Sequence, residues 1–280
     1  MSDFSRPQHQ SFLFVPGSQP DRFAKALASG ADAVIVDLED AVAPDAKAQA
    51  RRAVVEWASP ERPVLIRVNA RNTPWFAEDA QLLKLRGVVG VILPKAESAS
   101  DVVALISATR TKIPVFPLIE TAQGMWNALE IAKAPFVQQL MFGTLDFIAD
   151  MGMASDGYEL DTFRAQLVMI SRIAGILPPV DGVTPSIDDS ERLTAETTKG
   201  KRWGFGGKLC IHPKQIPIVN ACYTPSDSEI AWAQRVLDES GKANGAAVSV
   251  DGKMVDRPVV LQAQRVMNLV RKGHHATPLP

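Results

Sequence analysis

Two carboxylates in this sequence are placed where they could bind a cation. Glu120 directly follows the apolar run Val115–Ile119, and Asp146 comes shortly after the next such run, Gln139–Phe142. If the runs are adjacent strands, about 4.8 Å apart, the carboxylates converge and repel unless a cation or proton separates them. Mg²⁺ suits the pair better than Zn²⁺, because it prefers oxygen ligands and no His or Cys accompanies them. Alternatively, Glu120 caps the next helix and Asp146 accepts a hydrogen bond in a loop.

Arg67 is a charged residue between Ile66 and Val68 at the end of another apolar run. A guanidinium in a buried strand requires an anionic partner, because an unpaired buried charge is costly. Asp37 or Glu39, at the end of the preceding run, can supply that partner. The other possibility is a carboxylate or enolate oxygen of a substrate, which the forked donor geometry of arginine suits.

Asp37, Glu39 and Lys95 form a further charged group at predicted strand ends, with Asp40 beside them. We expect Asp37, Glu39 and Lys95 to orient the water bound to the metal from outside its ligand shell, and not to bind the ion directly. Lys95 has two interpretations, a Schiff-base nucleophile or an ion-paired lysine. Acidic neighbours raise the pKa of a lysine, so we predict an ion-paired Lys95.

Other conspicuous residues have structural explanations. His212, before Pro213, is either an acid–base group or a hydrogen-bonded structural histidine, and we favour the second. The segment Gly204–Lys208 lacks P-loop spacing and precedes a strand, so it predicts a turn. Cys210 and Cys222 have no metal-site spacing, and Cys210 is expected to be a small buried residue.

The elements that must position these residues alternate along the chain. Apolar runs of strand length recur, each followed by a segment with helical periodicity. The runs lack apolar–polar alternation, which is typical of strands buried on both faces. The predicted strands are Ser11–Val15, Ala33–Asp37, Val64–Val68, Gly90–Leu93, Val115–Ile119, Gln139–Phe142, Val180–Val183 and Lys208–Ile211. The predicted helices are Pro20–Ser29, Asp45–Ala58, Pro74–Arg86, Ala99–Thr111, Ala122–Ala132, Glu159–Gly175, Ser190–Gly200 and Pro213–Ala221.

Eight strand–helix pairs predict an α/β fold of the (β/α)₈ TIM-barrel type, whose active site lies at the C-terminal ends of the strands. A doubly wound open sheet is the alternative. Nearly all the ionisable residues considered above, from Asp37 to His212, lie at or shortly after the ends of predicted strands. The barrel therefore predicts that their side chains meet at its mouth.

The alternation stops beyond Cys222. A helix is expected over Ser226–Ser240, then a loop of small residues, then a last helix from Pro258 with proline in its first turn. We predict a flexible arm at residues 1–10, the barrel at 11–225, and a C-terminal helical extension at 226–280 that forms a lid or an oligomer contact. Asp256 is placed to be the N-cap of the last helix. His274 and His275 belong to a predicted frayed tail.

The composition limits the classes of partner. Of 280 residues, 46% are hydrophobic and 22% charged, with a formal net charge of −1. This balance gives no support to a nucleic-acid or membrane partner. The N-terminus has no apolar run of signal-peptide length and no stretch is long enough to span a bilayer, so we expect a cytoplasmic protein.

The motifs at the strand ends resemble those of the HpcH/HpaI aldolase/citrate lyase family, in particular its citrate lyase β-subunit-like members. The matching segments appear in the family's order along nearly the whole chain. They are Phe12–Gly17, Gly30–Val42, Ile66–Asn69, Leu93–Glu97, Ile119–Ala122, Phe142–Phe147, Gly207–Pro213 and Gly252–Pro258. Two positions depart from the common pattern, since Gln10 precedes Ser11 where many members have Arg, and Leu145 precedes Asp146 where many have Glu.

The resemblance implies an Mg²⁺-dependent lyase acting on a coenzyme A thioester such as citryl-, malyl- or citramalyl-CoA, with a 2-oxo acid as the other small molecule. It makes Glu120 and Asp146 the metal ligands, with Arg67 and Glu120 in contact with substrate. It also makes Asp256 the catalytic acid–base, delivered from a neighbouring subunit of a homotrimer.

Two other functions remain open. One is a class II aldolase acting on free 2-oxo acids, which would need neither coenzyme A nor Asp256. The other is a non-catalytic acyl-CoA-binding subunit of a lyase complex, against which the full set of charges at the barrel mouth argues.

Overall fold

The computed structural model describes residues 9–242 and 248–273. The chain forms two compact units, one ending at Asn220 and the other beginning at Ala221, and each is described by itself. The predicted arm falls largely outside the described residues, as does the predicted tail with His274 and His275. Within the described ranges, no helix has the length and apolar character needed to cross a membrane.

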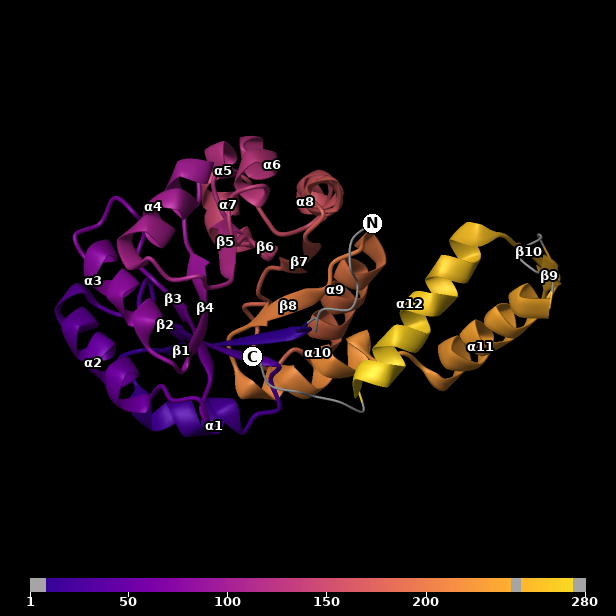
Figure 1. The fold of residues 1–280 in the computed structure, drawn as a ribbon, viewed down its shortest axis with the longest axis horizontal. Helices are drawn as coiled ribbons and strands as arrows, with labels where there is room; N and C mark the ends of the chain where they lie inside the picture. Colours follow the sequence, from indigo (N-terminus) through magenta and orange to yellow (C-terminus); the bar gives the residue numbers. More distant parts are fainter. Residues whose placement is uncertain (1–8, 243–247, 274–280) are drawn as a thin grey trace. The chain divides into compact units, whose positions relative to one another are not determined.

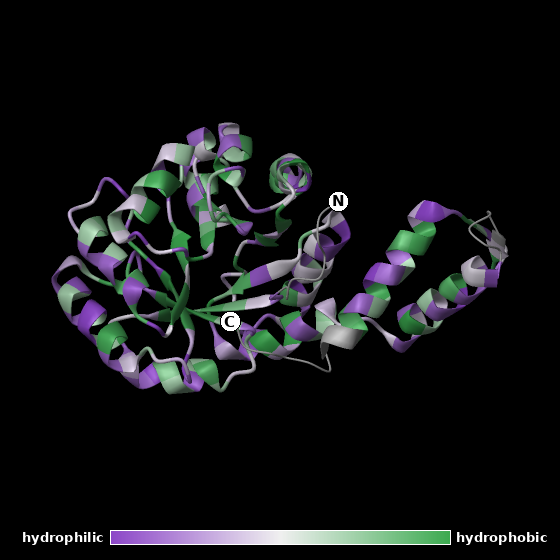
Figure 2. Cartoon of the chain, in the orientation of Figure 1, coloured by the Kyte–Doolittle hydropathy of each residue, from purple (hydrophilic) through white to green (hydrophobic). Residues whose placement is uncertain are grey.

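The first unit is a closed barrel of eight parallel strands, as predicted, and the open-sheet alternative is wrong (Figure 1). Strand β1 pairs with β2 on one side and with β8 on the other, which closes the sheet. In Figure 2, several of these central strands are drawn mostly in green, the colour of apolar residues. The strands are β1 (Ser11–Pro16), β2 (Ala33–Asp37), β3 (Val64–Arg67), β4 (Val88–Leu93), β5 (Val115–Ile119), β6 (Gln139–Phe142), β7 (Leu177–Asp181) and β8 (Gly207–Cys210).

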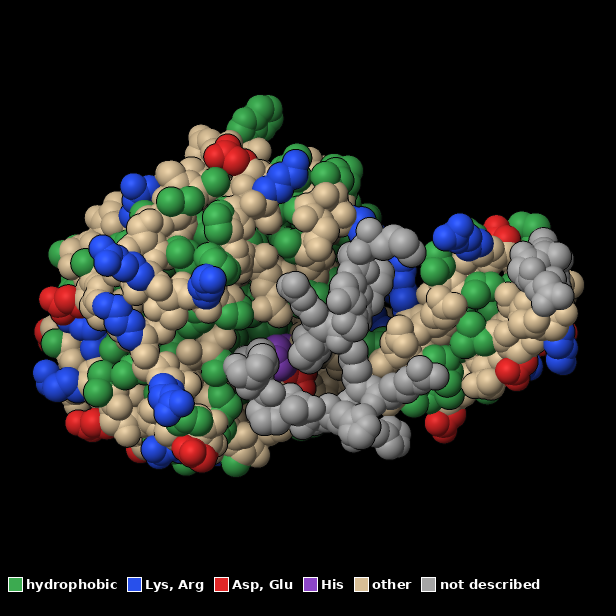
Figure 3. All heavy atoms as spheres, in the orientation of Figure 1, with side chains coloured by type: hydrophobic (Ala, Val, Ile, Leu, Met, Phe, Trp, Pro, Cys, Tyr) green, Lys and Arg blue, Asp and Glu red, His purple; other side chains and the backbone are tan. Residues whose placement is uncertain are grey.

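Helices cover the outside of the barrel (Figure 1). Where basic and acidic side chains are visible on the barrel in Figure 3, they lie intermixed with apolar ones. The helices are η1 (Pro20–Arg22), α1 (Phe23–Leu27), η2 (Pro44–Ala46), α2 (Lys47–Trp57), α3 (Phe76–Gln81), η3 (Leu82–Lys84), α4 (Ala99–Thr109), α5 (Ala122–Trp126), α6 (Ala128–Ala132), α7 (Thr144–Met151), η4 (Tyr158–Leu160), α8 (Asp161–Ala174), α9 (Ser190–Trp203), η5 (Pro213–Gln215) and α10 (Ile216–Tyr223), where η marks a 3₁₀ helix.

Alternate residues of the strands fill the barrel interior. They form one buried cluster, with Phe14, Val89 and Val183 packed against it. Side chains on one strand point to opposite faces in alternation, so this cluster also identifies which later residues on each strand face inward. The fully buried members are Phe12, Ala33, Ile35, Leu65, Ile92, Phe116, Leu118, Met141, Val180 and Leu209.

Two elements of the barrel differ most from the sequence prediction, while other bounds shift by one to three residues and the predicted helix Ala122–Ala132 is observed as α5 and α6. Strand β7 begins at Leu177, three residues before the predicted start. It includes two prolines, which argue against a strand because proline cannot donate a backbone hydrogen bond to its neighbour. The carbonyls of Pro178 and Pro179 nevertheless accept hydrogen bonds, from Gln139 Nε2 and from the N–H of Gly206. The second difference is α7, which was not predicted because the residues after β6 were interpreted as a loop.

The second unit pairs two helices, α11 (Asp227–Lys242) and α12 (Arg257–Gly273), through a small apolar core that includes Ala233, Val236 and Ala263. A hairpin of β9 (Val248–Val250) and β10 (Lys253–Val255) precedes α12, where only a loop was predicted. Its turn is Asp251-Gly252, with φ of 51° and 74°. Positive φ at both turn positions is typical of a type I′ turn, which Asp-Gly favours.

Candidate active site

The inward register of the barrel brings three of the predicted site residues together. Asp37, Arg67 and Glu120 each lie two positions beyond an inward-facing core residue, namely Ile35, Leu65 and Leu118. With a side-chain period of two, all three face the barrel axis at the C-terminal ends of β2, β3 and β5. This is the end of the barrel at which TIM-barrel enzymes hold their active sites.

Arg67 is held on three sides. Its Nε donates to Asp37 Oδ1 at 2.7 Å and its NH2 donates to Asp37 Oδ2 at 2.6 Å, while NH1 lies 3.1 Å from Glu39 Oε2. The guanidinium also stacks over the ring of Phe14, 4.8 Å from its centroid. Burial alone would lower the pKa of Arg67, but the two carboxylates outweigh burial and raise it. The structural partner that the sequence predicted is therefore present.

Lys95 is ion-paired, as predicted. Its Nζ lies 2.6 Å from Glu39 Oε1. Burial lowers the pKa of Lys95, but the hydrogen bond to Glu39 and the nearby carboxylates raise it overall. A lysine that stays protonated is a poor Schiff-base nucleophile. Burial also raises the pKa of Glu39, against the opposing effects of Arg67 and Lys95.

Glu120 is almost completely buried, at 1% exposure. Its Oε1 accepts a hydrogen bond of 2.6 Å from the backbone N–H of Lys95. Burial, together with the charges of Glu39 and Asp146, raises the pKa of Glu120 to about 8. The alternative that Glu120 caps the next helix is wrong, because Thr121 caps α5 by accepting from the N–H of Gly124.

Asp146 lies half-buried in the first turn of α7 and not in a loop. Its charge reaches Glu120, since it contributes to the raised pKa of that carboxyl. Gly143, between β6 and α7, leaves the room that Glu120 needs, because a Cβ there would lie 2.6 Å from Glu120 Oε2. Glu120 and Asp146 thus face the same region from neighbouring strand ends.

The charges of the site do not cancel. Arg67 and Lys95 are matched by Asp37 and Glu39 in direct ion pairs. Glu120 and Asp146 remain as two carboxylates that repel each other. No group of three or more His, Cys, Asp or Glu side chains is arranged around a metal position in the described residues. Mg²⁺ commonly takes only one or two carboxylates and completes its shell with water and substrate oxygens, so this pair fits that ion.

Asp256 lies in the second unit, at the start of α12. The N–H of Val260 donates to its carbonyl at 3.0 Å, and the N–H of Val259 approaches its Oδ1 at 3.4 Å. The predicted N-cap position of Asp256 is therefore confirmed.

Two further interpretations from the sequence are confirmed. His212 Nδ1 accepts a hydrogen bond from the N–H of Lys214, as a structural histidine does. Gly204 ends α9 with φ of 104°, so the glycine-rich segment begins as a turn, while its last two residues, Gly207 and Lys208, already belong to β8. Three buried polar residues behind the site were not predicted from the sequence as part of it, namely Lys47, Asn69 and Asp79. Two of them could have been found from the sequence, because Lys47 and Asp79 are charged residues at positions of predicted helices where apolar residues are expected.

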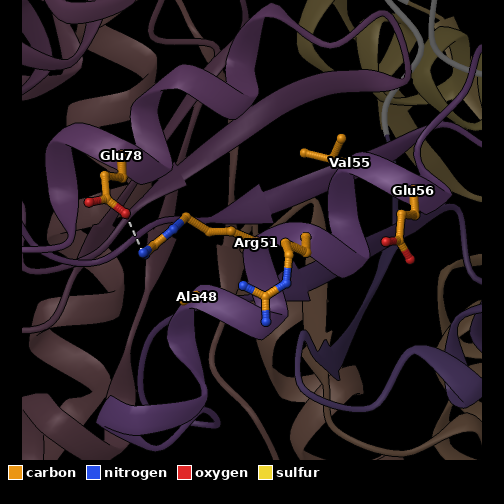
Figure 4. Close-up of a pocket in the computed structure, with 6 residues that line it drawn as sticks. Ala48, Arg51, Val55, Glu56 and Glu78 are labelled. Atoms are coloured by element: carbon orange, nitrogen blue, oxygen red, sulfur yellow. Dashed lines mark ion pairs between the residues drawn. The ribbon is translucent and has the colours of Figure 1, made fainter.

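A hollow on the outer helices is separate from the barrel interior (Figure 4). It is lined by residues of α2 and by Glu78 of α3, and Arg51 reaches across it toward Glu78. The carboxylates at the strand ends are not among its lining residues.

A closed barrel with a charged site at its strand ends has the architecture of TIM-barrel enzymes. A family model described as carbon–carbon bond lyases of the TIM-barrel fold matches residues 168–271. The chain belongs to the HpcH/HpaI aldolase/citrate lyase family, whose model matches residues 10–213. The resemblance found in the sequence is confirmed.

Relatives of known name cover almost the whole chain. A citrate lyase subunit beta-like protein of Mycobacterium tuberculosis is 40% identical over 274 residues, which is 95% of this chain and 96% of the relative. A (3S)-malyl-CoA thioesterase of Cereibacter sphaeroides is 36% identical, covering 92% and 93%. The CitE protein of M. tuberculosis, solved with magnesium, acetoacetate and coenzyme A, superimposes with a TM-score of 0.83 at 37% identity, covering 94% of this chain and 98% of that chain.

Proposed function

We propose that this enzyme is an Mg²⁺-dependent lyase that cleaves a 3-hydroxyacyl-CoA into an acyl-CoA and a 2-oxo acid, or forms it by the reverse condensation. The observation that carries the proposal is the charge balance of the barrel mouth. Two cations are paired with two carboxylates, and Glu120 and Asp146 are left over. One divalent cation would neutralise that pair, and the related CitE structure contains magnesium with coenzyme A and a 3-oxo acid.

Glu120 and Asp146 would hold the ion through their carboxylate oxygens. When bound, Mg²⁺ supplies Lewis-acid polarisation of a 2-oxo acid oxygen and a template for its carboxylate. Lys95 keeps Glu120 in place through its backbone N–H. Together with Asp37 and Glu39, Lys95 would orient the water bound to the ion without binding the ion itself, as expected from the sequence.

Arg67 would stabilise the charge that develops during the reaction. In cleavage, a base takes the proton of the hydroxyl group, and the electron pair of the breaking C–C bond moves to the α-carbon of the acyl thioester. The resulting enolate places negative charge on the thioester oxygen, where preorganised donors lower the barrier. Asp37 and Glu39 do not use every N–H of the Arg67 guanidinium, because arginine has five donors.

Asp256 would deliver a proton to the α-carbon of that enolate in the cleavage direction and remove one in condensation. We place Asp256 in the site of a neighbouring subunit of a homotrimer, on the basis of the family-like segment Gly252–Pro258. Its position as N-cap of α12 is compatible with this role, since a cap uses only part of a carboxylate's accepting capacity. The cytoplasmic location also remains a prediction from the sequence.

The test is a substrate screen of the purified protein with Mg²⁺. Malyl-, citramalyl-, citryl- and methylmalyl-CoA are supplied in turn, and the 2-oxo acid and free thiol are measured separately. A lyase releases 2-oxo acid without free thiol, whereas a thioesterase such as the Cereibacter relative releases free thiol. Turnover of free hydroxy acids without coenzyme A would instead support a class II aldolase. No turnover with any of these substrates would favour a non-catalytic acyl-CoA-binding subunit.

A further inference from the structure

The geometry of Arg67 depends on a short stretch of main chain at the end of β2. Asp37 holds Arg67 with both carboxylate oxygens, and the same oxygens accept from the N–H groups of Glu39 and Ala41. Glu39 then holds Arg67 and Lys95 through its carboxylate. The main chain between Asp37 and Glu39 therefore determines where the guanidinium of Arg67 lies.

Lys47 fixes that main chain from behind. It is the first residue of α2 and is 5% exposed. Its Nζ donates to the carbonyl oxygens of Leu38, at 2.9 Å, and of Glu39, at 3.0 Å. The ammonium also lies over the ring of Trp75, 4.8 Å from its centroid. Burying an ammonium costs free energy unless it is well compensated, so stability alone is a weak reason for lysine here.

Asn69 and Asp79 hold the same stretch from a second direction. Asn69 Nδ2 donates to the carbonyl of Leu38 at 2.9 Å and to Asp79 Oδ2 at 2.6 Å. The N–H of Asn69 donates to the same Asp79 oxygen at 2.8 Å. Asp79 is completely buried, and its other oxygen accepts from Arg51 at 3.1 Å. Arg51 continues outward to Glu78, across the hollow drawn in Figure 4.

We propose that Lys47, together with Asn69 and Asp79, is a positioning group for Arg67, acting through the main chain of Leu38 and Glu39. None of the three needs to touch substrate. They hold two carbonyl oxygens with three donated hydrogen bonds, so that Asp37 and Glu39 present their carboxylates to the guanidinium at fixed places. The inference rests on the proposed role of Arg67 in acyl-CoA cleavage, but its structural part can be measured without any substrate.

The first experiment compares Lys47→Met with Val54→Ala by amide hydrogen exchange. Methionine keeps an unbranched side chain of similar length and removes the donor. Val54 lies on the same helix and is 1% exposed, and its apolar side chain donates to neither carbonyl. The reporters are the amides of Leu38, Glu39 and Ala41, all hydrogen-bonded in this stretch. We expect exchange there to be about tenfold faster in Lys47→Met and unchanged in Val54→Ala.

The second experiment measures turnover with the acyl-CoA found in the substrate screen. Lys47→Met should lower kcat about 10- to 100-fold, the usual cost of losing a supporting residue, with little change in KM. Val54→Ala should lower the melting temperature without this loss of kcat. In an Arg67→Lys background, Lys47→Met should cost less than about twofold, because the effects of residues that act through one another are not additive.

Asn69→Ser provides an independent variant if Lys47→Met does not fold, and it should show the same faster exchange and the same non-additivity with Arg67→Lys. Unchanged exchange in the reporter amides, or the full loss of kcat in both backgrounds, would overturn the proposal. If wild-type protein turns over no acyl-CoA, the proposed function fails, while the exchange comparison still decides whether Lys47 positions this stretch.

Discussion

The backbone N–H of Lys95 donates to Glu120 Oε1 at 2.6 Å, although these residues follow different strands. Lys95 reaches this position with a left-handed φ of 47°, a conformation that costs a non-glycine residue about 1–2 kcal/mol. Its side chain meets Glu39 at 2.6 Å. One residue therefore holds a carboxylate with its main chain and a second carboxylate with its side chain.

Lys95→Gly and Lys95→Met test the side-chain contribution. Both variants keep the backbone N–H that donates to Glu120 and lose the ion pair with Glu39, and glycine also adopts positive φ readily. We expect Lys95→Gly to bind Mg²⁺ nearly as wild type by calorimetric titration. Both variants should lose about tenfold or more in kcat, as expected for a residue behind a metal site. Wild-type kcat in both variants would show that the ion pair has no part in turnover.

Glu120→Gln and Asp146→Asn should each abolish Mg²⁺-dependent turnover while the fold persists. Replacing a ligand carboxylate by an amide removes the negative charge that the ion requires. Without metal, Glu120→Gln should melt at or above the temperature of wild type, because burial and the charges of Glu39 and Asp146 disfavour the ionised form of Glu120 and an amide carries no charge. Thermal melts and kinetics with and without a chelator are the measurements. Full activity in the presence of the chelator would contradict the metal assignment.

Arg67→Lys should lower kcat by about 100-fold or more, as loss of a preorganised donor to a developing oxyanion does. Lysine provides a point charge and cannot pair with Asp37 through two parallel bonds. Circular dichroism and kinetics on the same sample distinguish the causes. A protein that has lost its native spectrum would make Arg67 a structural residue, and a folded, fully active one would remove it from the mechanism.

Asp256→Asn should bind metal and acyl-CoA normally and lose proton transfer. Mixing Asp256→Asn chains with Glu120→Gln chains should restore part of the activity, because one site of a mixed oligomer can combine an intact barrel with an intact Asp256 from its neighbour. Each variant must be inactive alone, and mass spectrometry must detect mixed oligomers. Mixed oligomers without activity would mean that Asp256 works within its own chain or only caps α12.

His9 should make stability fall in mild acid. It is 8% exposed and packs edge-on against Phe12. Burial lowers the pKa of His9 below 6.5, although Asp32 opposes the shift. The unfolded chain then binds the proton more readily, so the free energy of unfolding decreases as pH falls below about 6.5 toward the folded-state pKa. Urea unfolding of wild type and His9→Phe at several pH values tests this. An identical pH dependence in both proteins would rule His9 out as the cause.

Most of the barrel could be predicted from local pattern. Strands β2, β5 and β6 have their predicted bounds. A strand buried on both faces needs a continuous apolar run, and the run ends where the chain reaches the mouth of the barrel. Strand β7 was misplaced since Pro178 and Pro179 argue against a strand when only local propensity is considered. Their carbonyls are satisfied by Gln139 and Gly206, from elsewhere in the chain.

By itself, the sequence determined the fold class, the family and the set of charged residues at the strand ends, because these follow from the spacing of apolar runs and from motifs. Only the tertiary structure decided which charges pair. It joined Arg67 to Asp37 and Glu39, left Glu120 buried with Asp146, and placed Lys47 behind the main chain of Leu38 and Glu39. The physical reason is that ion pairing and burial depend on distances between strands, and the order of residues along one chain does not set those distances.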